Sequence, residues 1–304
     1  MSTLVLGHKN PDTDSIASAI SAAYLYRARG IDAEAAAQGA PAPETEFVLK
    51  RFGLEAPQVI DSVEGREVYL VDFSDLAQAP ADFAKCRLMG IVDHHKLGDV
   101  TSDYPLECWI QPVGCANTVL KVMYDFYGVE VPKAIAGAML CAILSDTVLF
   151  KSPTCTEADK KAAKELAEIA GVEDLEALGM EMFKAKSNLN ASPRDLIFRD
   201  FKDFDMGGRK VGIGQLELIS LAMVTPELKA ELKAELAKVK GEGRHTAILV
   251  LTDIMKEGSE LLAVSDDEET VVSALKADKA TMWMPGVMSR KKQVVPPLQL
   301  AFKA

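Results

Sequence analysis

The stretch LVLGHKNPDTDS, residues 4–15, carries the strongest information on the fold. Its first three residues form an apolar run that predicts a short buried strand, and Pro11 among clustered polar residues predicts a loop. Ser15 is a suitable cap for the alanine-rich helix that follows, in which Ile16 and Ile20 share one apolar face. A strand, a polar loop and a helix in this order are typical of an α/β fold.

Two further apolar runs predict strands beside the first. Val68–Val71 ends at Asp72, and Leu88–Val92 ends at Asp93-His94-His95. Because both runs are continuous rather than alternating, they suit strands that are buried on both faces, as in a parallel sheet. We therefore expect an N-terminal domain of the α/β class, built on a parallel sheet.

A polar, proline-containing stretch, SNLNASPR at 187–194, separates two patterned regions and favours a domain boundary. We predict an N-terminal domain over 1–188, a linker over 189–194 and a smaller C-terminal α/β domain over 195–304. The C-terminal domain is expected to contain a leucine-rich helix and three strands. The strands are predicted at Val211–Leu218, Ala247–Thr252 and Glu260–Val264.

Two helices have clear start and stop signals. Thr156 and Asp159 form a capping box ahead of a helix that Gly171 ends. Thr225-Pro226 opens the leucine-rich helix, which Gly241 ends. Each predicted domain therefore contains a helix with defined ends.

The composition limits the possible functions. The chain has 304 residues, 45 acidic and 34 basic side chains and a formal net charge of −11, and 48% of its residues are hydrophobic. That hydrophobic fraction excludes intrinsic disorder as the main state. The lack of a basic block argues against broad binding to nucleic acid or to an anionic membrane surface, since both need Lys and Arg. A focused site for a small anion stays open.

Neither a targeting signal nor a membrane span is expected. Residues 1–30 lack a basic leader, and the longest apolar run, Ala134–Leu144, is shorter than the roughly 20 residues that cross a bilayer. The five cysteines never form C-x-x-C, which disfavours a disulfide framework and a zinc-thiolate site. We expect a cytoplasmic protein.

Histidines and aspartates gather where the three predicted strands end. They are His8, Asp12, Asp14, Asp72, Asp93, His94 and His95. We expect them on one rim, because ligands bind beyond the carboxyl ends of strands in open α/β sheets. Carboxylates with imidazoles and no thiolate favour Mn²⁺, Co²⁺ or Mg²⁺ over structural zinc. With Asp146 added, the carboxylates are too many for one ion, so two divalent cations are expected.

Each part of this cluster has a simpler interpretation when taken alone. Asp12 and Asp14 can be turn residues around Pro11, Asp72 can cap a helix, and His94-His95 can be an exposed pair at a strand end. Their coincidence at three strand ends favours the metal site.

A basic segment near the C-terminus, Ser289–Gln293, is the second candidate site. We expect a loop that binds an anion, because Arg offers a fork to phosphate oxygens and Lys a compact charge. The alternative is an ordinary solvated basic stretch. Nucleotide-binding glycine motifs, G-x-S-x-G and H-E-x-x-H are absent. His245 lies outside these clusters and is interpreted as a surface or domain-packing residue.

Six groups of residues resemble the motifs of the family II, manganese-dependent inorganic pyrophosphatases, which belong to the DHH phosphoesterase superfamily. They are Gly7–Ser15, Val71-Asp72, Asp93-His94-His95, Pro112–Cys115, Ser145-Asp146 with Lys151–Thr154, and Ser289–Gln293. The last segment distinguishes this family within the superfamily. The resemblance covers nearly the whole chain. It implies a DHH-type N-terminal domain, a DHHA2-type C-terminal domain, an active site in the cleft between them and a homodimer.

The resemblance also implies a role for each candidate residue. One metal is held by His8 and Asp12, the second by Asp14, His94 and Asp146, and Asp72 bridges both. The substrate-binding residues are His95, Lys202, Arg290 and Lys291. Asp93 is expected to orient an imidazole from outside the ligand set. One departure is Phe73-Ser74, where many members carry His-Asn, and it bears on the hydrogen bonding around Asp72.

The implied reaction is the hydrolysis of pyrophosphate to two phosphates. Two Mn²⁺ ions, for which Co²⁺ or Mg²⁺ can substitute, share a water and lower its pKa, and the resulting hydroxide attacks one phosphorus in line. Asp72 and His95 are the expected catalytic residues, with His95 donating a proton or a hydrogen bond to the leaving oxygen.

Two other functions are set beside this one. Another DHH-type phosphoesterase, such as an exopolyphosphatase or an oligonucleotide phosphodiesterase, usually has a GGGH-type motif, which Gly241–His245 matches poorly. The second alternative is a non-catalytic module that senses a metal or a nucleotide. The interval from Asp72 to Asp93 is too short for a nucleotide-binding insert, and the ligand set is complete.

Overall fold

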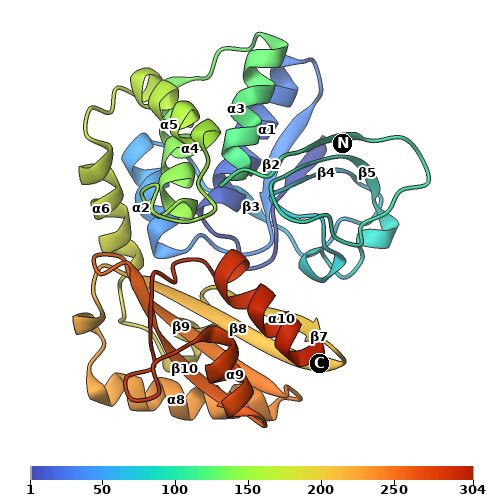
Figure 1. The fold of residues 1–304 in the computed structure, drawn as a ribbon. Coiled ribbons are helices and arrows are strands. Elements are labelled where there is room, and N and C mark those ends of the chain that lie inside the picture. The colour runs from blue at the N-terminus through green and yellow to red at the C-terminus, as the bar shows by residue number, and fades with distance from the viewer. Residues whose placement is uncertain (1, 304) are drawn as a thin grey trace. The chain divides into compact units, whose positions relative to one another are not determined.

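The structure is a computed structural model that describes residues 2–303, and the chain forms two compact units (Figure 1). Unit 1 comprises the chain up to Phe150 together with Thr154–Met182. Unit 2 comprises Lys151–Pro153 and the chain from Phe183 onward. The linker expected at 189–194 stays a prediction, and its last two residues begin helix α7, Pro193–Phe198.

Unit 1 is built on a six-stranded sheet in which every pair of neighbouring strands is parallel. The strands are β1 (Thr3–Leu6), β2 (Ala33–Ala37), β3 (Gln58–Val59), β4 (Glu67–Val71), β5 (Arg87–Asp93) and β6 (Glu107–Ile110). Their order is β3-β2-β1-β4-β5-β6, so the three strands that the sequence singled out are neighbours. The predicted parallel α/β sheet is confirmed.

Helices pack mainly on one face of this sheet (Figure 1). They are α1 (Thr13–Ala28), α2 (Pro43–Phe52), α3 (Ala116–Tyr127), α4 (Lys133–Asp146), α5 (Glu157–Ala170) and α6 (Leu175–Lys186), with short turns η1 (Leu76–Gln78) and η2 (Phe83–Lys85). Val5 and Val92 point into the helix-covered core, whereas Leu6 and Leu70 belong to a second core on the other face. Burial on both faces explains the continuous apolar runs.

The cap of α1 differs from the sequence prediction. Asp12, not Ser15, is the N-cap, and its carboxylate accepts a hydrogen bond from the Ser15 N–H at 2.9 Å. Ser15 lies in the first turn, with its side chain packed against Gly7, where a Cβ would lie 1.9 Å from Ser15 Oγ. The prediction was wrong because the helix begins three residues earlier than assumed, at Thr13.

Helix α4 occupies the centre of the helical layer. Every residue from Ile135 to Ser145 is buried, and Asp146 is the last residue of the helix. The apolar run of the sequence is therefore a core helix. In the part of the chain that the structure describes, no helix is both long and apolar enough to cross a membrane.

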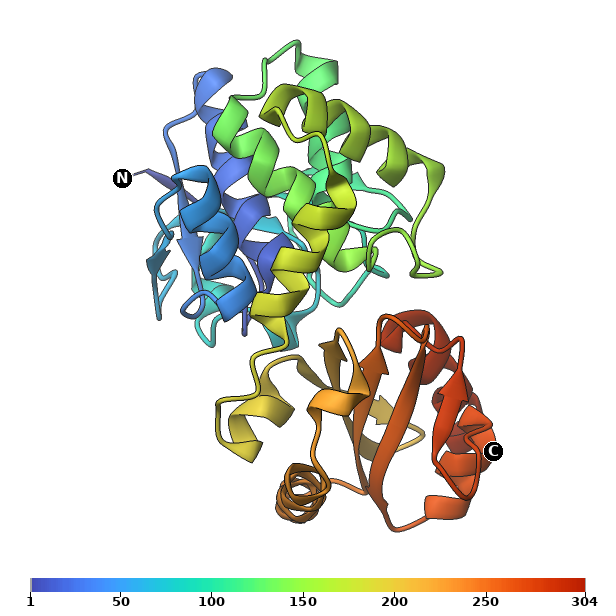
Figure 2. The ribbon, with the colours of Figure 1, turned by 90° about the vertical axis from the view of Figure 1, so that its left-hand side faces the viewer.

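Unit 2 is a smaller α/β unit with a mixed sheet of order β11-β10-β9-β8-β7, in which only β8 and β9 pair in parallel. The strands are β7 (Phe201–Met206), β8 (Arg209–Leu218), β9 (Thr246–Asp253), β10 (Gly258–Ser265) and β11 (Trp283–Pro285). The remaining elements are η3 (Leu221–Met223), α8 (Pro226–Gly241), α9 (Glu268–Leu275), η4 (Arg290–Val294) and α10 (Val295–Lys303). Figure 2 shows α8 on one face of the sheet and α9 with α10 on the other.

The basic segment near the C-terminus is helical rather than a loop. Arg290–Val294 forms one π-helical turn that leads into α10, and the Ser289 hydroxyl caps it by accepting from the Lys292 N–H at 3.3 Å. The loop prediction overlooked Ser289 as a cap. His245 packs against Phe302 within the same unit, with ring centroids 5.4 Å apart, which agrees with a packing role.

Candidate metal centre

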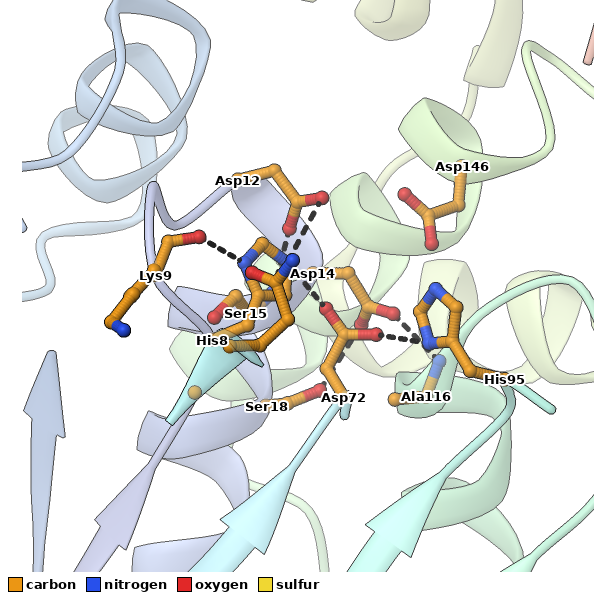
Figure 3. Close-up of polar contacts among 12 residues, drawn as sticks. His8, Lys9, Asp12, Asp14, Ser15, Ser18, Asp72, His95, Ala116 and Asp146 are labelled. Atoms are coloured by element: carbon orange, nitrogen blue, oxygen red, sulfur yellow. Dashed lines mark hydrogen bonds and ion pairs between the residues drawn. The ribbon is translucent and has the colours of Figure 1, made fainter. Parts of the chain in front are cut away.

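The carboxyl ends of β1, β4 and β5 bring the predicted ligands of unit 1 together (Figure 3). His8 follows β1, Asp72 directly follows β4, and His94 directly follows β5. Asp14 comes from the first turn of α1, and Asp146 from the last residue of α4. The sequence alone did not place Asp146 on a helix end.

Asp72 lies between two imidazoles and presents one oxygen to each. Its Oδ2 is 3.3 Å from His8 Nε2, and its Oδ1 is 3.2 Å from His94 Nε2. Around His8, Asp12 Oδ2 is 3.5 Å from the same nitrogen. Around His94, the distances from Nε2 are 3.8 Å to Asp14 and 3.7 Å to Asp146. The cluster thus has two centres that share Asp72.

The backbone of Asp72 is in the left-handed region, with φ of 66°. Its N–H donates to the Val92 carbonyl at 2.8 Å, which extends the pairing of β4 with β5 by one residue beyond the end of β4. Aspartate tolerates this conformation better than most residues, but it still stores strain, and such strain is concentrated at functional sites. This left-handed backbone conformation allows the Asp72 carboxylate to lie at the carboxyl end of the sheet.

The two imidazoles are held in one tautomer. His8 Nδ1 is 2.7 Å from the Lys9 carbonyl, and His94 Nδ1 is 3.1 Å from the Val113 carbonyl. A carbonyl oxygen only accepts, so Nδ1 carries the hydrogen and the Nε2 lone pair of the neutral ring faces carboxylates. Two electron-rich atoms in contact repel each other, and a cation between them removes the repulsion. The donor set therefore fits divalent metal ions.

The carboxylates on the His94 side are arranged at an electrostatic cost. Burial and the negative charge of Asp72 raise the pKa of Asp14 to about 6. Burial and the charge of Asp14 raise the pKa of Asp146 well above its usual value. Asp146 also lies at the negative end of the α4 dipole. Burial acts on Asp72 too, but in the metal-free protein the protonated rings of His8 and His94 donate hydrogen bonds from Nε2 to its carboxylate and hold its pKa well below the usual value.

Cys115 is one residue that the sequence analysis left out of the ligand set. Its sulfur and carboxylate oxygens of Asp14 and Asp146 all lie within 4.8 Å of one another. Burial and the charge of Asp14 raise the pKa of this thiol well above its usual value, which favours the neutral form. The only signal in the sequence was its place in the Pro112–Cys115 motif.

His95 differs from His94 in exposure and in partner. Its side chain is 28% exposed, against 6% for His94. Its Nδ1 is 2.9 Å from Asp93 Oδ1, which also accepts from the N–H groups of His94 and His95. Burial raises the pKa of Asp93, but the side-chain hydrogen bond, the charge and the backbone N–H of His95 together leave the pKa below its usual value. An ionised Asp93 therefore orients the ring of His95.

The departure at Phe73-Ser74 points away from the ligands. Phe73 is buried in the core on the second face of the sheet. Ser74 accepts a hydrogen bond from the Gly98 N–H at 3.0 Å, and a Cβ on Gly98 would lie 2.1 Å from the Ser74 carbonyl oxygen. The contacts between Ser74 and Gly98 therefore hold the loop that follows His95 against the end of β4.

Apart from His95, the predicted substrate-binding residues belong to unit 2. Arg290 Nη1 donates to the carbonyls of Asp200 at 2.7 Å and Ile213 at 3.2 Å, and its Nη2 donates to Asp200 Oδ1 at 2.6 Å. Lys202 pairs with Ile213 across β7 and β8, so Arg290 and Lys202 lie at the same part of the sheet. Lys291 follows Arg290 in η4. Arg290 thus already has a carboxylate partner, which the sequence did not indicate.

Comparisons with known proteins match both units. The model of the DHH family, N-terminal domain, matches residues 2–143, and that of the DHHA2 domain matches 180–301. A relative from Archaeoglobus fulgidus, assigned to the manganese-dependent inorganic pyrophosphatases, is 49% identical over 98% of this chain and 97% of its own. A manganese-dependent inorganic pyrophosphatase of Methanothrix thermoacetophila is 42% identical over 98% of both chains.

A solved structure gives the same result. The crystal structure from Methanococcus jannaschii assigned to the family II inorganic pyrophosphatases has a TM-score of 0.90, is 44% identical and covers 100% of both chains. Identity at this level over the full length of each chain defines a family. This chain belongs to the family II, manganese-dependent inorganic pyrophosphatases of the DHH superfamily.

Proposed function

We propose that this protein hydrolyses inorganic pyrophosphate to two phosphates and depends on manganese to do so. The observation that carries the proposal is the position of Asp72, with one oxygen toward His8 and the other toward His94. A carboxylate shared in this way can hold two ions close enough together to act on one phosphoryl group. The names of the full-length relatives support the same reaction.

The ligand sets follow from the two centres. His8 and Asp12 would hold one ion, Asp14, His94 and Asp146 the other, and Asp72 both. When bound, two divalent cations lower the pKa of water and neutralise charge on the phosphate oxygens. Manganese is the proposed ion, because carboxylates and imidazoles without a thiolate suit it, and Co²⁺ or Mg²⁺ can substitute.

His95 is the proposed proton donor to the leaving phosphate. Its Nδ1 is fixed by Asp93 at 2.9 Å, so its Nε2 is the atom that can deliver a proton. Asp72 and His95 are accordingly the two residues to which we assign catalytic roles. Lys202, Arg290 and Lys291 would bind the phosphate oxygens, with Arg290 supplying its planar fork.

The test is phosphate release after chelation and re-addition of single metals. Pyrophosphate, tripolyphosphate and a dinucleotide are compared, each with Mn²⁺, Co²⁺, Mg²⁺ or Zn²⁺. We expect turnover to return with Mn²⁺ and pyrophosphate to be the preferred substrate. Equal rates on tripolyphosphate or the dinucleotide would favour another DHH-type phosphoesterase. Metal binding with no phosphate release from any substrate would favour a sensing module.

We also propose a homodimer in the cytoplasm. Strand β6 is an edge of the unit 1 sheet, and beside it Phe126 is 69% exposed with its ring 5.2 Å from that of Trp109. An open edge next to the exposed ring of Phe126 suits a second copy. Sedimentation of Phe126→Glu against the unaltered chain tests the dimer.

The five cysteines are all free, which suits a reducing compartment.

A further inference from the structure

We infer that Asp159, a carboxylate outside the proposed ligand set, is a positioning residue that orients two metal ligands at once. It acts through residues 113–117, which comprise the end of the connection from β6 and the first two residues of α3. The inference rests on the proposed function, because the ligands concerned, His94 and Asp14, are those assigned to the second metal. All residues involved belong to unit 1.

Asp159 is fully buried, and both of its oxygens are used. Oδ1 accepts from the Gly114 N–H at 3.0 Å and from the Thr118 hydroxyl at 2.6 Å. Oδ2 accepts from the Gly114 N–H at 2.9 Å and from the N–H and hydroxyl of Thr156, each at 2.7 Å. The carboxylate therefore joins the start of α5 to a segment more than 40 residues earlier in the chain.

Only part of this arrangement is explained by helix capping. Asp159 and Thr156 form the capping box of α5, in which each side chain accepts from the backbone N–H of the other. A capping box needs no partner outside its own helix. The contacts with Gly114 and Thr118 are additional, and they bring a negative charge into a site where water cannot reach it. Such a carboxylate is costly to bury unless several donors surround it.

Glycine at 114 makes the close approach possible. A Cβ there would lie 2.9 Å from Asp159 Oδ2 and 2.7 Å from the Thr147 methyl group. Both distances are shorter than a carbon atom allows. The backbone of the segment is thus fixed directly against the carboxylate, with no side chain between them.

The same short segment supplies the partners of two ligands. The Val113 carbonyl, one residue before Gly114, is 3.1 Å from His94 Nδ1 and sets the tautomer of the ring. Two residues after Gly114, the Ala116 N–H donates to Asp14 Oδ2 at 2.7 Å. The Asn117 side chain donates to Asp14 Oδ1 at 2.7 Å. A shift of the segment would misplace both ligands, and partners of this kind typically contribute about 10- to 100-fold in metal affinity.

The test compares Asp159→Ala with Thr156→Ala. Both variants lose the capping box, but only Asp159→Ala releases Gly114 and Thr118. The measurements are the unfolding midpoint of the metal-free protein, Mn²⁺ affinity by competition with a chelating dye, and the visible spectrum of the Co²⁺-loaded protein. Affinities are measured at a temperature at which each variant is folded.

We expect Asp159→Ala to bind one of its two Mn²⁺ ions about 10- to 100-fold more weakly and to change the Co²⁺ spectrum. Thr156→Ala should lower the midpoint and leave affinity and spectrum unchanged. Unchanged Mn²⁺ affinity in Asp159→Ala would overturn the inference. So would an equal loss of affinity in Thr156→Ala, because the carboxylate would then act only through helix stability.

Asp159→Asn keeps the test decisive if Asp159→Ala fails to fold. Its amide oxygen can still accept from Thr156 and Gly114, and its amide nitrogen can face the Thr118 hydroxyl, which is able to accept. We expect a smaller loss of affinity at the same single ion, and unaltered binding of both ions would contradict the inference. Pyrophosphate hydrolysis by the unaltered protein is measured separately. Its absence would count against the proposed function and not against the role of Asp159 in metal binding.

Discussion

The metal centre of unit 1 and the basic turn of unit 2 handle charge in opposite ways. In unit 1, burial and the charge of Asp72 raise the pKa of Asp14, and burial and the charge of Asp14 raise the pKa of Asp146. In unit 2, Arg290 is paired with Asp200 at 2.6 Å and bound to two carbonyls. Without added cations, the carboxylates of the first region are not neutralised. In the second region, the charge of Arg290 is neutralised by Asp200. We therefore expect the metal centre to respond strongly to added metal. We expect the basic turn to respond only to substitutions of its own residues.

The largest expected effect is that of Asp72→Ala, which removes the carboxylate shared by both centres. We expect Mn²⁺ affinity to fall by more than the factor of about 10–100 typical of residues that only support a ligand, and turnover to be lost. Equilibrium dialysis against Mn²⁺ and a phosphate-release assay measure the two effects. Tight binding of two ions by this variant would contradict the role of Asp72 as a ligand shared by both centres.

Asp72→Asn separates the ligand from the backbone. Asparagine accepts the left-handed conformation that residue 72 adopts, while alanine does not do so readily. We expect both variants to lose metal but Asp72→Asn to retain more thermal stability without metal. Equal midpoints would show that the strain at this position is unimportant.

Changes at Arg290 come next in size. Arg290→Ala should raise the KM for pyrophosphate by about 10- to 100-fold, since a hydrogen bond to a charged group is worth about 1.5–3 kcal/mol. Arg290→Lys should recover only part of this loss, because it keeps the charge but not the fork. Mn²⁺ affinity serves as the control and should be unchanged. A parallel fall in metal affinity would contradict the separation of the two regions.

Removal of metal should make stability depend on pH. The pKa of Asp14 is about 6 in the folded protein against 3.8 as its usual value, so unfolding releases a proton between these pH values. The metal-free protein should therefore lose stability as pH rises from about 4 to 6, and stay less stable above. Each 1 kcal/mol lost corresponds to roughly 2–4 °C in the midpoint.

Scanning calorimetry with chelator and with saturating Mn²⁺ checks this prediction. The difference between the two midpoints should grow from pH 5 to pH 7. Asp14→Asn provides the control and should flatten the curve of the metal-free protein. A metal-free midpoint that rises over this interval would contradict the assigned cause.

The smallest expected effect is that of Asp200→Asn. The amide keeps an oxygen near Arg290 and removes only the negative charge, so anion binding should strengthen and KM should fall a few-fold at low ionic strength. Salt should reduce the difference. The control is Asp203→Asn, three residues further along the chain, which removes the carboxylate that forms an ion pair with Arg244. An equal effect of both variants would assign the change to overall charge.

The sheet of unit 1 could be predicted from sequence because its pattern is local. Continuous apolar runs ending in Asp72 and in Asp93-His94-His95 identify both the strands and the edge where ligands gather. The capping box at Thr156 and the start of α8 at Thr225 were also predicted correctly. Each of these features depends on neighbouring residues in the chain, so one sequence is enough to find it.

Other features depend on contacts between distant residues and gave no local signal. Asp159 was identified as a capping residue, but its bonds to Gly114 and Thr118 depend on how α5 packs on α3. The pairing of Arg290 with Asp200 joins residues 90 positions apart. The roles of the ligands themselves came from the family resemblance and remain proposals.

Helix α4 has a consequence for the choice of ion. Its residues from Ile135 to Ser145 are buried, so the helix cannot shift without disturbing the core around it. Asp146, at its end, is thus held at a spacing from His94 that is set by packing and not by whatever ion arrives. Magnesium requires short, nearly octahedral bonds and gives up its water reluctantly. We therefore expect the proposed site, with its fixed spacing and imidazole ligands, to bind Mg²⁺ more weakly than Mn²⁺, and the core of this unit to contribute to that preference.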